Sequence, residues 1–216
     1  MFTLADKVTL EPDPTMCFLA ASVGFSDSAS PYWHLKLHSL PAYTSLIPPE
    51  ERGQGYDKVA FGVDCRDLAF DVADWTQLAQ RIVEVPEASL SCAFRLFQWE
   101  DLSSLSLRFG RTRPGEIEVF ADGVGGAESI PDLFPDSEVS FSVHTWARFL
   151  GVSIKVPVNA GDFGAYAQRQ LRRLLPGLTY GEPTIRRAVN EAGHLLGVEV
   201  IYPPLWTCPI GDPGTD

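Results

Sequence analysis

The sequence predicts an α+β fold, a curved, mainly antiparallel sheet packed by two to four helices. Over the first 150 residues, short apolar or alternating runs separated by turn residues are typical of strands. In the last third, apolar residues recur at helical spacing. The composition, 45% hydrophobic and 21% charged over 216 residues, is that of a globular chain. We expect a sheet domain over residues 1–176 and a helical and strand extension over residues 177–216 that packs on the same core.

The expected strands follow two patterns. Residues 32–38 alternate between apolar side chains and polar ones, as in a half-buried strand. Residues 105–109 and 117–121 alternate in the same way on either side of a Pro-Gly turn, which predicts a hairpin with one solvent-exposed face. The other expected strands are apolar runs at 16–23, 59–63, 68–72, 90–98, 139–143, 152–156 and 198–202.

Four helices are expected. Asp74 and Asp162 stand at N-cap positions, and each precedes a run with apolar residues at helical spacing. These runs predict helices that extend to about Val83 and to about Leu175. Two further helices are expected, at 145–150 and 183–196.

The charge is distributed unevenly along the chain. Residues 1–142 contain 22 Asp and Glu against 10 Lys and Arg, whereas residues 143–216 contain 6 against 7, which gives the net charge of −11. An acidic surface repels nucleic acid and anionic lipid and attracts basic proteins. We therefore expect a basic protein partner, and neither nucleic acid nor a membrane.

Several features predict a cytoplasmic protein without a cofactor. No apolar run approaches the roughly 18 residues that a membrane span requires. The first 13 residues carry acids where a secretory signal has a basic head. The four cysteines, at positions 17, 65, 92 and 208, have neither metal-ligand nor redox-motif spacing, which favours a reducing compartment.

Catalytic motifs are absent from the sequence. The glycine-rich run 122–126 lacks the Lys and the Ser or Thr of a phosphate-binding loop, and no nucleophile elbow occurs. His34 and His38 lie about 13 Å apart on a strand, too far to share a metal ion.

The densest group of acids leaves one catalytic alternative open. Paired carboxylates can bind a divalent metal or divide acid and base roles. A metal-dependent hydrolase that uses Asp64, Asp67 or Asp71 together with Asp122 is therefore a second hypothesis.

The order of the expected elements carries a family resemblance. An edge strand is followed by an acidic strand and helix, by paired strands, by two further strands and by an amphipathic helix that ends in Leu-Leu-Pro. These elements lie at 32–38, 70–83, 92–109, 117–121, 139–143 and 162–176. This order resembles the small α+β immunity proteins encoded beside bacterial polymorphic or contact-dependent toxins. The resemblance implies a protein that binds a cognate toxin, in many cases a basic nuclease, and blocks it.

We therefore expect a non-enzymatic immunity protein that binds and neutralises a basic protein toxin. The expected contact surface includes the loops 41–55 and 122–136. Exposed aromatic anchors and acids complete it; these residues are Asp64, Asp67, Asp71, Asp122, Tyr43, Tyr56 and Phe134. A third hypothesis is a structural or assembly subunit of a phage or secretion system.

Overall fold

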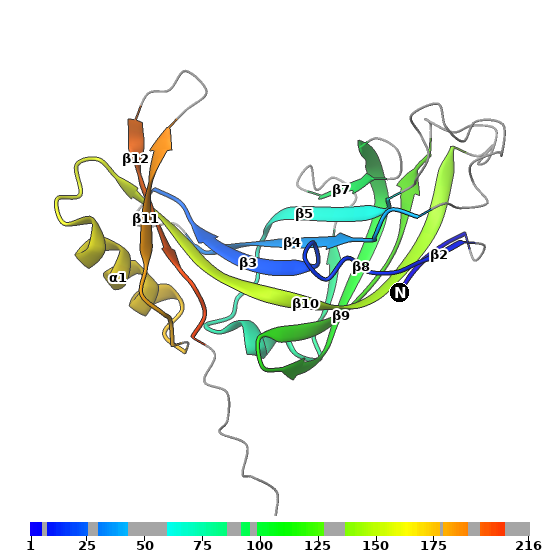
Figure 1. Ribbon diagram of the computed structural model, residues 1–216, viewed down its shortest axis with the longest axis horizontal. Coiled ribbons are helices and arrows are strands. Elements are labelled where there is room, and N and C mark those ends of the chain that lie inside the picture. Colours follow the sequence, from blue (N-terminus) through cyan, green and yellow to red (C-terminus); the bar gives the residue numbers. More distant parts are fainter. Residues whose placement is uncertain are drawn as a thin grey trace, which may run out of the picture.

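The structure is a computed structural model and is dominated by strands (Figure 1). It describes residues 1–5, 8–25, 30–42, 60–85, 92–95, 99–127, 137–177, 179–189 and 195–205. The strands are β1 (Phe2–Leu4), β2 (Val8–Leu10), β3 (Phe18–Val23), β4 (Tyr32–His38), β5 (Gly62–Leu68), β6 (Ile82–Val85), β7 (Cys92–Arg95), β8 (Trp99–Arg113), β9 (Glu116–Gly126), β10 (Glu138–Pro157), β11 (Thr184–Val189) and β12 (Leu195–Tyr202). The helical elements are the 3₁₀-helix η1 (Trp75–Leu78) and the α-helix α1 (Phe163–Leu174).

Seven of the strands close into a barrel. Their backbone pairing runs in the order β10, β3, β4, β5, β7, β8 and β9, and β9 pairs again with β10. Each pair is antiparallel except β10–β3, which is parallel. The prediction of an α+β fold with two to four helices is therefore wrong, because the sheet closes on itself and one α-helix is present among the described residues.

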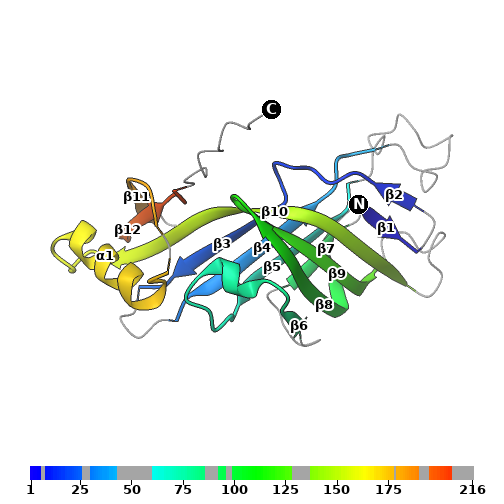
Figure 2. The same ribbon diagram turned by 90° about the horizontal axis from the view of Figure 1, so that it is seen from below.

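β10 organises the fold because it is 20 residues long and takes partners along both edges. One edge pairs first with β9 and then with β12, while the other edge pairs with β1 and then with β3. Figure 2 shows β10 crossing the molecule, with an arm of α1, β11 and β12 at one end and β1 and β2 at the other. The change of partners occurs around Gly151, whose φ is 104°. A Cβ at this position would lie 2.1 Å from the carbonyl oxygen of Tyr202, so glycine permits β12 to approach.

Aromatic and aliphatic side chains fill the barrel. Toward the arm, Trp33 and Phe149 are buried with ring centroids 6.2 Å apart. At the other end Phe61 contacts Phe94 and Phe141 at centroid distances of 5.0 and 5.3 Å. Large buried rings contribute much of the apolar area removed from water, and their contacts with one another fill this part of the barrel interior.

The predicted helix after Asp162 is confirmed, and the one after Asp74 is mostly wrong. The Asp162 carboxylate accepts a hydrogen bond of 3.0 Å from the Ala165 amide at the start of α1. Asp74 also acts as an N-cap and accepts from the Thr76 amide at 2.7 Å. The helix that it caps is a single 3₁₀ turn, because the chain enters β6 and pairs with β8 instead of continuing.

The other two predicted helices are strands. Residues 145–150 lie inside β10, where side chains alternate between buried and less buried positions. Residues 183–196 cover β11 and the start of β12, which form a hairpin. A Cβ at Gly197 would come 2.0 Å from the Val156 carbonyl oxygen. This glycine serves close packing of β12 on β10 and does not end a helix.

Two further element boundaries differ from the prediction. Two strands joined by a turn were expected between residues 59 and 72, but β5 runs without a break through Asp64. The expected loop 122–136 is also strand over its first five residues, which belong to β9.

No helix in the described part of the chain is long and apolar enough to cross a membrane.

Candidate functional site

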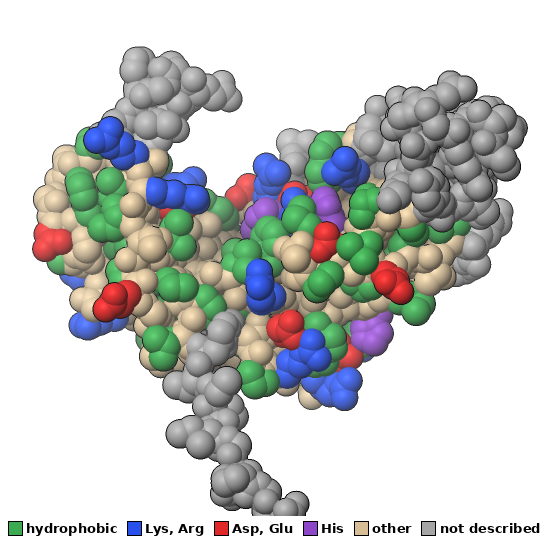
Figure 3. All heavy atoms as spheres, viewed as in Figure 1, with side chains coloured by type: hydrophobic (Ala, Val, Ile, Leu, Met, Phe, Trp, Pro, Cys, Tyr) green, Lys and Arg blue, Asp and Glu red, His purple; other side chains and the backbone are tan. Residues whose placement is uncertain are grey.

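The outer surface of β3, β4 and β5 lines a hollow between the barrel and the arm (Figure 3). As the alternation predicted, β4 buries Trp33, Leu35 and Leu37. His34 and Lys36 therefore project outward. Figure 3 shows Lys, Arg and His side chains gathered around this hollow, although the chain as a whole is acidic.

Asp64 is held inside a small cluster in the hollow. Its carboxylate lies 2.8 Å from His34 Nε2 and 3.3 Å from Arg66 Nε, and its side chain is 6% exposed. Burial alone would raise the pKa of Asp64, but the hydrogen bonds and charges of His34 and Arg66 outweigh it and lower the pKa to about 2. The His34 ring also meets Phe18 edge-on at 5.3 Å. The Asp64 carboxylate thus interacts with His34 and Arg66 of its own fold.

The other predicted acids do not gather around Asp64. Asp67 is exposed at the end of β5, in the left-handed conformation with a φ of 56°. Asp122 is exposed on β9, which β7 and β8 separate from β5 around the barrel wall. Within the described ranges, no group of three His, Cys, Asp or Glu could hold a metal ion. The geometry therefore does not support the metal-dependent hydrolase.

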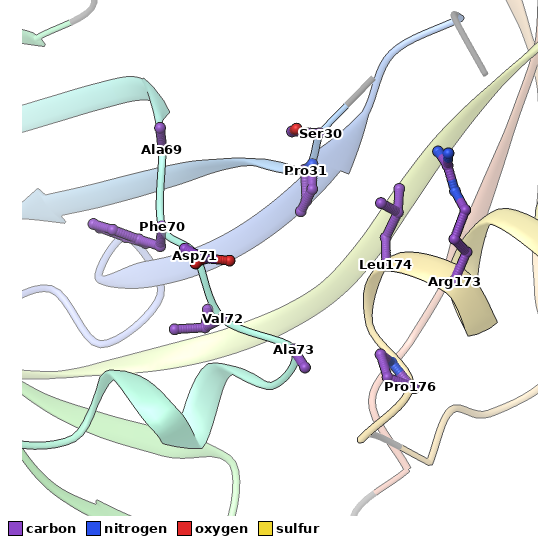
Figure 4. A pocket seen from close by; sticks show the side chains of 10 residues that line it. All are labelled: Ser30, Pro31, Ala69, Phe70, Asp71, Val72, Ala73, Arg173, Leu174 and Pro176. Carbon is purple, nitrogen blue, oxygen red and sulfur yellow. The ribbon is translucent and has the colours of Figure 1, made fainter. Parts of the chain in front are cut away.

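Asp71 lies at a cleft of about 540 Å³ (Figure 4). The cleft separates the chain segment that follows β5 from the C-terminal end of α1. Asp71 comes from the first of these elements and Arg173 from the second. The lining is otherwise mostly apolar and consists of Ser30, Pro31, Ala69, Phe70, Val72, Ala73, Leu174 and Pro176. One carboxylate and one guanidinium on separate elements make a charge-balanced cleft, not an acidic one.

A second cluster lies on the outer face of β8, β9 and β10. The Glu118 carboxylate accepts hydrogen bonds from Arg111 Nε at 3.1 Å and from the Arg111 amide at 3.2 Å, and lies 2.9 Å from His144 Nε2. Arg111 and His144 lower the pKa of Glu118 to about 2. Phe120 stacks on His144 with centroids 4.2 Å apart, and Arg108 lies over the Phe120 ring.

Sequence reasoning missed this second cluster. The hairpin prediction placed Glu118 on the solvent-exposed face, and the structure buries it there to 7% exposure of the side chain. The available signal was the hairpin register itself, because outward residues of paired strands face one another. The partner His144 comes from β10, and no local sequence pattern predicted that β10 pairs with β9.

Several described strand ends lie together at the end of the barrel away from the arm. His38 at the end of β4 pairs with Gly62 at the start of β5, and Gly62 pairs with Arg95 at the end of β7. At the same end, Gly126 closes β9 opposite Glu138, where β10 begins. The described residues that flank segments 43–59 and 128–136 therefore lie at one end of the barrel, which we call the contact end.

The contact end also carries exposed apolar side chains. Trp99, the first residue of β8, is 48% exposed, and Arg95 lies over its ring at 5.7 Å. Leu40, two residues beyond β4, is 39% exposed. A large exposed aromatic side chain with an arginine beside it is typical of protein interfaces.

Most of the net negative charge lies outside the described residues. The described residues contain 16 Asp and Glu against 14 Lys and Arg, and the remaining segments contain 12 against 3. Segments 43–59 and 128–136 together hold six of these acids and two bases. The predicted anchors Tyr43, Tyr56 and Phe134 belong to these two segments and lie outside the described residues.

Comparisons of the chain with protein-family models, with curated proteins and with solved structures found no match. The α+β order of elements that carried the resemblance to immunity proteins is not the order in the structure, so the resemblance stays an untested prediction that rests on the charge alone.

Proposed function

We propose that this chain is a non-enzymatic binding protein that captures a basic protein, in the manner of an immunity protein that neutralises a toxin. The observation that carries the proposal is topological. Both segments that the sequence singled out as contact loops, 41–55 and 122–136, include residues that follow from the contact end of the barrel. Segments 43–59 and 128–136 hold six acids in the sequence, and Trp99 is exposed at the contact end.

The ion pairs that four described acids form within the fold support the same proposal. Glu199 hydrogen bonds to Arg186 and Ser153, and Glu116 pairs with Arg113. Together with Asp64 and Glu118, these acids are already paired within the fold, Glu199 on the arm and the other three on the barrel. The described residues nearly balance, with 16 acids against 14 bases, whereas segments 43–59 and 128–136 hold six acids against two bases. The long-range attraction of this surplus for a basic protein speeds association.

We place the protein in a reducing compartment, the cytoplasm. Cys17, Cys65 and Cys92 are buried thiols in the structure. No disulfide is needed to hold a chain of this size, because its buried apolar core is large.

Capture from a lysate of the native host tests the proposal. The immobilised full chain should retain a basic protein at 1:1 stoichiometry, and association should slow about tenfold between low and high salt. The captured protein, expressed alone, should arrest growth, and co-expression of this chain should restore it. A retained partner that is acidic, or whose association does not respond to salt, contradicts the proposal.

Two matched pairs of variants locate the contact. Trp99→Ala should weaken binding of the captured partner at least tenfold, while Ile185→Ala, at an apolar residue on the arm that is also exposed, should leave it unchanged. A triple variant at 128, 132 and 136, with Gln or Asn for each acid, should slow association more than one at 67, 71 and 122. Equal effects within both pairs would place the contact elsewhere.

A further inference from the structure

We infer that Cys65 and Cys92 form a modification site, a dithiol that a small-molecule disulfide converts into an intramolecular disulfide between β5 and β7. The two residues are 27 positions apart in the chain and show no motif spacing. The barrel places them directly opposite each other in the antiparallel pairing of these strands.

The geometry allows the bond without movement of the backbone. Residues directly opposite in an antiparallel pair have Cα atoms about 4.5 to 5.5 Å apart, and disulfides span about 4.4 to 6.8 Å. Both side chains point to the same face, since Cys65 follows the inward Val63 at a spacing of two and Cys92 precedes the inward Phe94 in the same way. A hydrogen bond that the Cys65 thiol shares with the Cys92 sulfur, together with burial, raises the pKa of Cys65.

The chemistry is thiol–disulfide exchange with a disulfide such as oxidised glutathione. Cys92 is the more accessible thiol, 9% exposed against 0% for Cys65, and attacks first as the thiolate. This step forms a mixed disulfide and releases one glutathione thiolate. Cys65 then displaces the second glutathione. The Cys65–Cys92 bond forms, the glutathione disulfide is reduced to two thiols, and these take up the two protons that the cysteines lose.

Access depends on β7, a weakly held part of the barrel. β7 has four residues and pairs with β8 at three positions. Short strands with few pairs open locally more readily than long ones, and such opening exposes both thiols. In the closed barrel, the contact with Cys92 and burial raise the pKa of Cys65, so the exchange waits on this opening. Once formed, the bond covalently links two barrel strands beside the contact end.

The test uses the full chain with Cys208→Ser, incubated in glutathione buffers of increasing disulfide content. The expected product has lost two hydrogen atoms, yields a linked peptide that contains residues 65 and 92, and retains Cys17 as a thiol. Its melting temperature should rise by about 5 °C over that of the reduced form. The matched variant with Cys92→Ala should show neither the mass change nor the rise.

Refolding from guanidinium in the same oxidising buffer exposes both thiols to the glutathione disulfide before the barrel forms, so burial no longer limits the reaction. If the refolded native protein still holds both thiols, carries a glutathione on each cysteine, or links Cys17 instead, the opposed positions do not accommodate the bond and the inference is overturned. None of these outcomes depends on whether a basic partner exists.

Discussion

Replacement of Glu118 by Gln tests the reasoning about the second cluster most directly. The Glu118 side chain is 7% exposed and accepts from Arg111 and His144 at 2.9 to 3.3 Å. A hydrogen bond to a charged group contributes about 1.5 to 3 kcal/mol net. Arg111 and His144 are 77% and 54% exposed, so water replaces much of what they lose. We expect Glu118→Gln to lower the free energy of unfolding by about 2 kcal/mol at pH 7.

The loss should depend on pH in a defined direction. The folded pKa of Glu118 is about 2, below its ordinary value of 4.5. The unfolded chain therefore binds the proton first as the pH falls, and stability from the ionised carboxylate is present above about pH 4.5 and disappears toward pH 2. The difference between wild type and Glu118→Gln should be largest at pH 7 and clearly smaller at pH 3.

Urea unfolding of both proteins at pH 7 and pH 3 measures this difference. Glu116→Gln is the control, because Glu116 pairs with Arg113 on the surface, and such a pair contributes about 0.5 kcal/mol. A Glu118→Gln loss that equals the control loss, or that is the same at both pH values, would refute the assigned role of the cluster.

Three further predictions concern single positions. Asp64→Asn should lower the free energy of unfolding by about 1 to 2 kcal/mol, whereas Asp67→Asn, at a left-handed φ that Asn tolerates, should change it by less than about 0.5 kcal/mol; chemical denaturation compares the two. Burial, aided by nearby cations, lowers the pKa of His38 to about 4 from 6.5. The free energy of unfolding of the wild type should therefore fall by about 2 kcal/mol as the pH drops from 6.5 to 4, because the unfolded chain binds the proton first. Melting curves of His38→Phe should show a smaller dependence on pH over this range. Gly151→Ala should destabilise the protein by about 3 kcal/mol or more in thermal melts, since its Cβ would meet the Tyr202 carbonyl at 2.1 Å.

The correct predictions came from local patterns. The alternation in residues 32–38 and on both sides of Pro114-Gly115 identified β4 and the β8–β9 hairpin. The capping aspartate and the helical spacing after it identified α1. These patterns depend on neighbours within a few residues, which the sequence contains.

The wrong predictions share a physical cause. Residues 183–196 have a Pro and a Gly at their limits, which fits a helix as well as a hairpin. Pairing of β12 with β10 decided between the two, and that pairing joins residues about 45 positions apart. Tertiary contacts of this kind override local propensity.

The candidate sites show the same division. The acid surplus and its position along the chain were read directly from the residues, and so was the list of contact candidates. The hydrogen bonds of Asp64 and Glu118 to His34 and His144 on neighbouring strands were not, because these histidines are 30 and 26 positions away in the chain.

By itself, the sequence determined that residues 32–38 form a half-buried strand, that Asp162 begins a helix, and that the acid surplus lies within residues 1–142. Only the tertiary structure decided that the sheet closes into a barrel, that Cys65 faces Cys92, and that the described residues flanking the two acidic segments lie at one end. The reason is that side-chain period and capping are encoded within a turn or two of chain, whereas strand order and register arise from the burial of the whole apolar surface at once.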